Sequence, residues 1–138
     1  MGASREVNTS AAAAEELYAA LEADDVPRIL ELCAEDVSVR YPAEGRLPYG
    51  GTWVGRIGVE GFLDAHDAAE EILEFEVRRM VADGDTVIAL GHFVGRAKPG
   101  GGEWSTDFVH HLTIVDGRLR RWEAFFDTAA AVAAREHL

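Results

Sequence analysis

Residues 73–127 read LEFEVRRMVADGDTVIALGHFVGRAKPGGGEWSTDFVHHLTIVDGRLRRWEAFFD. This stretch contains four runs rich in β-branched and aromatic residues, and turn-forming residues separate them at 83–85, 99–102 and 116–117. Short turns of this kind join neighbouring strands in antiparallel order. The pattern therefore predicts a four-stranded antiparallel meander in the second half of the chain.

The residues before the meander have helical spacing. From Ser10, which is a good helix cap, the apolar side chains repeat along one helical face and predict a first helix. Asp24, Asp25 and Pro27 interrupt that pattern and start a second helix, whose apolar stripe runs from Val26 to Cys33. Residues 1–9 are small and polar and are expected to form a disordered tail, which leaves 10–138 as a single domain.

Four further segments complete the chain. The run VSVRYP (37–42) alternates apolar and polar residues and predicts a short strand ended by proline, and the glycine-rich residues 43–56 predict a loop. A third helix is expected from about Ile57 to Glu71, and Thr128 to His137 predict a final short one. Helices followed by an antiparallel sheet are typical of the α+β class, in which the helices cover one face of the sheet.

Composition limits the partners of this domain. The 138 residues carry a formal charge of −12, which disfavours binding to nucleic acid or to an anionic membrane surface. A single cysteine, Cys33, excludes an internal disulfide and a zinc site built from paired thiols. There is no apolar run of membrane-spanning length and no signal-peptide pattern, so the sequence favours a cytoplasmic protein.

Strand alternation predicts which side chains face the helices. The hairpin around 99–102 places His92 opposite residues 108–110, and therefore on the same face as His110. At Asp116-Gly117 a two-residue turn would pair His110 with Glu123, whereas a three-residue bulged loop would pair it with Trp122. We favour the bulged loop, because it gathers the apolar residues on one inner face: Phe108, His110, Leu112, Ile114, Trp122, Ala124 and Phe126.

This order of elements resembles the NTF2-like superfamily, specifically its SnoaL-like and ketosteroid-isomerase-like branch. The segments that carry the resemblance are LYAALEADDVPRILELCAEDVSVRYP (17–42), GTWVGRIGVEGFL (51–63) and DFVHHLTIVDGRLRRWEAFFDTAA (107–130). The resemblance implies a cone-shaped, curved, mainly antiparallel sheet packed on three N-terminal helices, a cystatin-like α+β barrel around an apolar pocket. It also implies a bacterial, cytoplasmic protein that forms a homodimer through the outer sheet face.

The chain departs from the ketosteroid isomerase pattern at all three catalytic positions. The aspartate base of that family falls on Tyr41, its oxyanion-hole tyrosine falls on Leu17 beside Tyr18, and its protonated aspartate falls on His110. Classical steroid isomerisation is therefore not expected. The limonene-epoxide-hydrolase branch uses an Asp-Arg-Asp set, and it remains an alternative only if a register shift turns the acids Asp107, Glu123 and Asp127 inward.

Inward titratable residues are the candidates for catalysis. Imidazole titrates near neutrality, so His110 is expected to act as a general base or a hydrogen-bond donor, with His92 and Tyr41 as its catalytic partners. No inward carboxylate is expected beside them, and neither a metal ion nor a cofactor is predicted. The expected substrate-binding wall comprises Tyr18, Trp53, Phe62, His66, Leu90, Phe108, Leu112, Trp122 and Phe126.

These residues lead to two hypotheses about function. The first is a cofactor-free isomerase, cyclase or lyase that acts beside a carbonyl group of an apolar, polyketide- or steroid-like substrate, with the SnoaL-like polyketide cyclases as the closest reaction class. The second is a non-catalytic protein of the same fold that binds a hydrophobic ligand or serves as a dimeric scaffold. In either case Val109, Leu119 and Phe125, among the charges of Arg121 and Glu123, are expected to form the homodimer interface.

Overall fold

The computed structural model describes the backbone of residues 2–136 and the side chains of residues 9–136. In chain order the elements are α1 (Gly2–Glu22), α2 (Val26–Glu31), β1 (Cys33–Tyr41), β2 (Gly51–Val54), α3 (Gly55–Ala69), β3 (Glu70–Asp83), β4 (Thr86–Ala97), β5 (Glu103–Val115), β6 (Arg118–Phe126) and α4 (Thr128–Ala133). The α+β class and the meander β3 to β6 that the sequence predicts are therefore confirmed.

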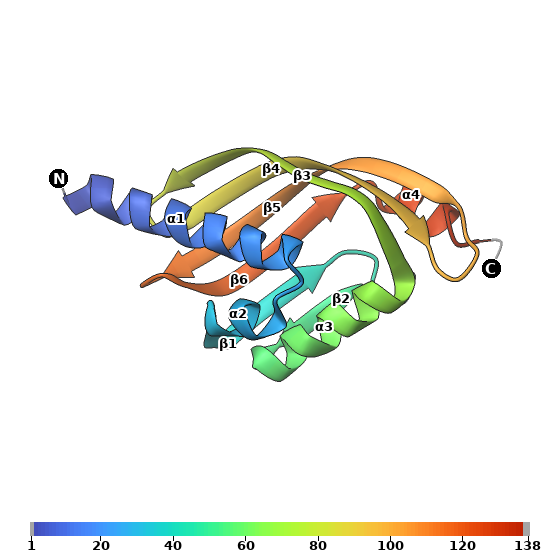
Figure 1. The fold of residues 1–138 in the computed structure, drawn as a ribbon, viewed down its shortest axis with the longest axis horizontal. Helices are drawn as coiled ribbons and strands as arrows, with labels where there is room; N and C mark the ends of the chain where they lie inside the picture. The colour runs from blue at the N-terminus through green and yellow to red at the C-terminus, as the bar shows by residue number, and fades with distance from the viewer. Residues whose placement is uncertain (1, 137–138) are drawn as a thin grey trace.

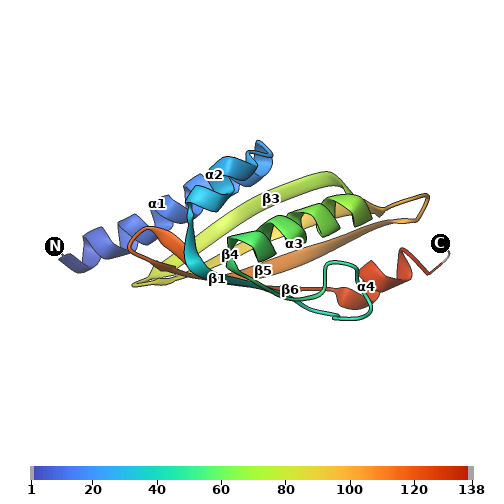
Figure 2. The same ribbon diagram turned by 90° about the horizontal axis from the view of Figure 1, so that it is seen from below.

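The strands form one sheet in the order β2-β1-β6-β5-β4-β3, which is curled but not closed. All neighbouring strands are antiparallel except β1 and β6, which run parallel. Figure 1 shows α1 crossing in front of this sheet, and Figure 2 shows α1, α2 and α3 together on one side of it. The curl of the sheet around these helices gives the architecture that the resemblance implies.

Several boundaries differ from those predicted. Helix α1 begins at Gly2 and not at Ser10, and α2 ends before Cys33, which opens strand β1. Strand β2 lies inside the segment predicted as a loop, where Trp53 pairs with Val39. A four-residue strand between glycines is too short to show an alternating pattern, and pairing with the longer β1 is what stabilises it.

Two glycines inside α3 explain how that helix packs so close to β2. A Cβ atom at Gly58 would lie 3.0 Å from the backbone carbonyl carbon of Trp53, and one at Gly61 would lie 3.3 Å from the Trp53 ring. The helical cost of glycine, roughly 1 kcal/mol per residue, is thus offset by close packing. This contact fixes α3 over the inner face of the sheet.

The register between β4 and β5 differs by one residue from the predicted one. His92 pairs with Asp107, and His110 pairs with Ala89. Because a shift of one residue turns every side chain to the opposite face, His92 and Leu90 lie on the outer face of the sheet. The prediction that His92 shares the inner face with His110 is therefore wrong.

The turn at Asp116-Gly117 combines features of both alternatives. It is a two-residue turn in which both residues have positive φ, 52° and 77°, and it is followed by a bulge between Thr113 and Ile114 on one strand and Leu119 and Arg121 on the other. Together they pair His110 with Ala124, which is neither predicted partner. The predicted inner face is nevertheless confirmed, since Phe108, His110, Leu112, Ile114, Trp122 and Ala124 are all buried.

One residue expected on the outer face of the sheet lies on the inner face. Leu119 is 3% exposed, because the two-residue turn pairs it with the inward-facing Ile114, whereas Phe125 remains 53% exposed on the outer face. The described part of the chain contains no helix with the length and apolar character needed to cross a lipid bilayer.

Candidate functional site

A cavity of about 540 Å³ lies between the inner face of the sheet and the helices α1 and α3. Aromatic side chains from β1, α3, β3, β4, β5 and β6 form much of its wall, and α1 and α2 supply aliphatic and acidic residues. The aromatic and histidine residues that line it are Tyr41, Tyr49, Phe62, His66, Phe75, Phe93, Trp104, Phe108, His110, Trp122 and Phe126.

Sheet register places two polar side chains on opposite sides of a small residue. Arg40 pairs with Glu123 across the parallel strands, so Tyr41 comes level with Ala124, and Ala124 in turn pairs with His110. Strands lie about 4.8 Å apart, which separates the backbones of Tyr41 and His110 by roughly 10 Å. Since alanine fills little of that gap, both polar side chains line the same open space.

His110 is buried, with 3% of its surface exposed, and one of its ring nitrogens is already engaged. Its Nδ1 lies 2.8 Å from the hydroxyl of Tyr18, and its ring is tilted against Trp122 at a centroid distance of 4.8 Å. Burial lowers the pKa of His110 to about 3, so the imidazole is neutral near pH 7.

The tautomer of His110 follows from Tyr18. Burial raises the pKa of the Tyr18 phenol, which therefore keeps its proton, and the described residues offer that proton no acceptor other than His110 Nδ1. Tyr18 thus donates to Nδ1, and the proton of the neutral imidazole resides on Nε2. No described residue accepts a hydrogen bond from Nε2, which leaves an N–H donor on a residue that lines the cavity.

Tyr41 and His66 form the opposite polar part of the wall. Their ring centroids are 6.3 Å apart, and neither side chain has a hydrogen-bond partner among the described residues. Burial raises the pKa of Tyr41 and lowers that of His66 to about 4, so both are neutral near pH 7. Tyr41 offers a hydroxyl donor, and His66 offers one nitrogen with a free lone pair.

Glu70 contradicts the expectation that no carboxylate faces inward. It is 2% exposed and accepts hydrogen bonds from the Tyr49 hydroxyl at 2.6 Å and from Trp104 Nε1 at 3.0 Å, while Arg135 forms an ion pair with it. This Glu70 cluster closes the cavity wall where α3 meets β3. The neighbouring Glu71 is exposed, and two adjacent acidic residues in a sequence give no sign that one of them is buried.

The cavity mouth carries charged side chains at its rim. Glu22, Asp24, Asp67 and Lys98 line the cavity and are exposed, and no ion pair joins them to other described residues. Within the described residues, histidine, cysteine and acidic side chains form no group of three that could hold a metal ion.

The remaining predicted site residues lie outside the cavity wall. Tyr18 lies behind His110, Leu112 is fully buried in the core, and Trp53 packs against Phe62 at 6.1 Å while donating to the backbone oxygen of Tyr49. Their positions on the inner face or in the α3 contact explain why the sequence suggested them. Leu90 is 36% exposed on the outer face and cannot contact a ligand in the cavity.

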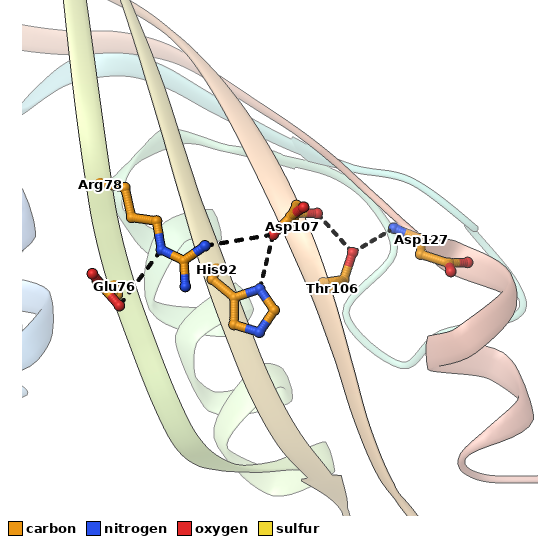
Figure 3. A network of polar contacts seen from close by, with 6 residues as sticks. All are labelled: Glu76, Arg78, His92, Thr106, Asp107 and Asp127. Carbon is orange, nitrogen blue, oxygen red and sulfur yellow. Dashed lines mark hydrogen bonds and ion pairs between the residues drawn. The ribbon is translucent and has the colours of Figure 1, made fainter.

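His92 belongs to a polar network on the outer face. Its Nδ1 lies 2.9 Å from Asp107, which also faces Arg78 at 4.0 Å, and Figure 3 shows these side chains converging across β3, β4 and β5. Asp107 is therefore turned away from the cavity, and Asp127 caps α4 by accepting from the amide of Ala130. With Glu123 next to Arg121 on the outer face, none of the acids needed for an epoxide-hydrolase site reaches the cavity.

Comparisons with known proteins agree with this fold. A model of the SnoaL-like domain family matches residues 14–122. No curated protein matches the chain. Among solved structures, an NTF2-like protein from Burkholderia xenovorans LB400 is 25% identical, with a TM-score of 0.85 over 93% of this chain and 96% of the other.

Two further solved structures have similar scores. An NTF2-like protein of unknown function from Burkholderia pseudomallei K96243 is 25% identical, with a TM-score of 0.83 over 93% of this chain and 98% of that one. TerC, which was co-crystallised with polyporic acid, is 28% identical, with a TM-score of 0.82 over 91% of this chain and 97% of that one.

Proposed function

Because the chain belongs to the SnoaL-like domain family, we propose that it is a small-molecule enzyme of the isomerase type that acts on an apolar, carbonyl-bearing compound. The observation that carries this proposal is the neutral, buried His110, whose Nδ1 is held by Tyr18 and whose Nε2–H has no partner among the described residues. A donor left unpaired in an aromatic cavity suits a ligand oxygen.

The chemistry follows from where charge develops in such a reaction. Removing a proton from the carbon beside a carbonyl group moves negative charge onto the carbonyl oxygen. Hydrogen-bond donors fixed around that oxygen in a water-poor site stabilise the charge without having to reorganise. The Nε2–H of His110 and the hydroxyl of Tyr41, on either side of Ala124, are the two donors proposed for this role.

Of the two roles expected for His110, general base or hydrogen-bond donor, we propose the second. With its Nδ1 lone pair engaged by Tyr18 and its own proton on Nε2, the neutral imidazole has no free lone pair with which to accept a proton. As a neutral donor it takes the place of the protonated aspartate that the ketosteroid isomerase pattern has at this position. No cofactor is assigned, because the proposed step needs only a proton acceptor and donors to the oxygen.

The cavity favours an aromatic or polycyclic substrate. Its volume of about 540 Å³ falls within the range of roughly 300–1,000 Å³ that is usual for small-molecule sites. The aromatic wall provides flat apolar contact surfaces. TerC, the similar protein that was co-crystallised with polyporic acid, makes that compound a reasonable ligand to test here.

One observation favours ligand binding without catalysis as the second candidate. The inward carboxylate Glu70 is held by Tyr49, Trp104 and Arg135, so it is not a free base. A protein that only binds an apolar carbonyl compound would need the donors and the cavity but no proton acceptor.

Deuterium exchange into a ketone distinguishes the two functions. We expect the protein to accelerate exchange of the hydrogens beside the carbonyl of 2-tetralone, a two-ring aromatic ketone, in heavy water as followed by proton NMR. His110→Ala and Tyr41→Phe should each slow this exchange by roughly 10²–10³-fold, which is typical of losing one oxyanion donor. His92→Ala is the matched control, because it removes a histidine from the outer face.

The outcomes separate the hypotheses. Tight binding of 2-tetralone with no accelerated exchange would contradict the enzyme and support the binding protein. Equal losses in His92→Ala and His110→Ala would contradict the role of the cavity donors.

A further inference from the structure

We propose that His66 is the catalytic base of this site, the residue that accepts the proton removed from the carbon beside the substrate carbonyl. This inference rests on the proposed function, which names two donors to the oxygen but no acceptor for the proton. It gives the α3 wall of the cavity a chemical role distinct from that of the sheet.

The position of His66 is set by helix α3. It follows Phe62 by one helical turn, so both side chains point from α3 toward the sheet and line the cavity. Its ring centroid lies 4.6 Å from that of Tyr49 and 6.3 Å from that of Tyr41. The proposed base therefore lies beside Tyr41, one of the two proposed hydrogen-bond donors to the carbonyl oxygen. The reaction requires this proximity, because the base removes a proton from the carbon next to that carbonyl group.

Both ring nitrogens of His66 are available. Neither has a hydrogen-bond partner among the described residues. Among the side-chain nitrogens and oxygens of those residues, only Trp122 Nε1 is both inaccessible to solvent and without a hydrogen-bond partner. The nitrogens of His66 also lack a partner, so they must be accessible to solvent. Since the residue lines the cavity, a ligand there can reach the lone pair.

The other possible acceptors of the cavity wall are engaged or remote. His110 receives the Tyr18 proton on Nδ1 and carries its own proton on Nε2, so it can only donate. Glu70 receives three donors from Tyr49, Trp104 and Arg135. The carboxylates Glu22, Asp24, Asp67 and Glu71 are exposed at the rim, where water competes for them.

The charges around His66 suit a base that begins the reaction neutral. Burial, the largest influence, lowers its pKa to about 4, so its lone pair is free near pH 7. Glu70 and Asp67 raise that pKa, whereas Arg135 and Lys98 lower it. When the substrate becomes an enolate, its new negative charge lies beside the new imidazolium and favours the transferred proton.

The proposed step is balanced without a co-reactant. The C–H bond beside the carbonyl breaks, its proton moves to a nitrogen of His66, and its electron pair forms a C=C bond. The carbonyl π electrons move onto the oxygen, which receives hydrogen bonds from Tyr41 and His110. Where a C=C bond adjoins that carbon in the substrate, the enolate is a conjugated dienolate, and return of the proton from His66 to the far carbon of that C=C bond completes an isomerisation.

The test uses the full-length protein with 2-tetralone as the probe. His66→Gln keeps a polar side chain of similar size but has no basic nitrogen. We expect it to bind 2-tetralone about as well as wild type and to slow deuterium exchange by roughly 10²–10⁴-fold. His92→Gln, the same change on the outer face, should leave exchange unchanged.

A second variant gives a readout that a structural role would not affect. His66→Ala leaves space at the base position, and added imidazole should restore part of its exchange rate while leaving His110→Ala unaffected. Exchange at the wild-type rate in folded His66→Gln would overturn the assignment of the base and leave the proposed function standing. A wild-type protein that binds 2-tetralone but never accelerates exchange would overturn both.

Discussion

Glu70 offers a sharp test of how the cavity wall is held together, because its neighbour Glu71 is the same residue in the opposite environment. Glu70 is buried and accepts from Tyr49, Trp104 and Arg135, whereas the Glu71 side chain is 50% exposed and pairs with Arg96 at 2.8 Å. The two substitutions Glu70→Ala and Glu71→Ala remove the same atoms from adjacent positions in the chain.

The expected magnitudes differ several-fold. Removing one partner of a buried ion pair costs about 3–5 kcal/mol, since the other charge stays buried and unpaired, and Arg135 has only 10% of its side chain exposed. An exposed ion pair such as Glu71 with Arg96 contributes about 0–1 kcal/mol. Against a total stability of about 5–15 kcal/mol, Glu70→Ala should shift the unfolding midpoint strongly and Glu71→Ala hardly at all.

Urea denaturation followed by circular dichroism measures both free energies of unfolding. Glu70→Gln serves as an intermediate case, because it retains an acceptor oxygen for Tyr49 or Trp104 but removes the negative charge facing Arg135. A loss of less than about 1 kcal/mol in Glu70→Ala, or equal losses at the two positions, would refute the buried role of Glu70.

Three further results are expected. The free energy of unfolding should fall as pH is lowered from about 6.5 toward 4, by at most about 1.4 kcal/mol per pH unit for each buried neutral histidine, because the unfolded chain takes up protons near pH 6.5 whereas folded His110 and His66 resist them down to about 3 and 4. Urea titrations in which His110→Phe keeps the full slope would contradict this. Ala124→Phe should fill the space between Tyr41 and His110 and abolish binding of 2-tetralone measured by calorimetry, whereas undiminished binding would place the ligand elsewhere. The chain should sediment as a homodimer through the outer sheet face, where Phe125 is 53% exposed, and Phe125→Lys should yield monomers; a wild-type protein that stays at 15.0 kDa would contradict the interface.

Much of the fold could be predicted from the sequence because local signals and global topology agree in the meander. Turn residues at 83–85, 99–102 and 116–117 separate apolar runs long enough to alternate clearly, and each run became a strand. Strand β2 could not be predicted, because its four residues have no alternating pattern of their own and are stabilised by pairing with β1.

The site could be predicted only where the observed strand register keeps each side chain on the face of the sheet that the predicted register gave it. His110, Trp122 and Phe126 reached the cavity because the two-residue turn and the bulge shift the register by an even number of residues relative to the favoured alternative. His92 was predicted on the wrong face because the observed β4–β5 register differs from the predicted one by an odd number of residues. No residue near 99–102 indicates that difference. Glu70 could not be predicted, since its three donors come from segments distant in the chain.

The central claim is that His110 is a neutral hydrogen-bond donor held by Tyr18 at the cavity, and nitrogen-15 NMR of the histidine side chains tests it most directly. With the His110 signals assigned by comparison with His110→Gln, the claim predicts a protonated Nε2 and an unprotonated Nδ1 that do not titrate between pH 5 and 8. Tyr18→Phe should alter the Nδ1 signal, and binding of 2-tetralone should alter that of Nε2. An imidazole that titrates near its ordinary pKa of about 6.5, or a proton found on Nδ1, would contradict the account.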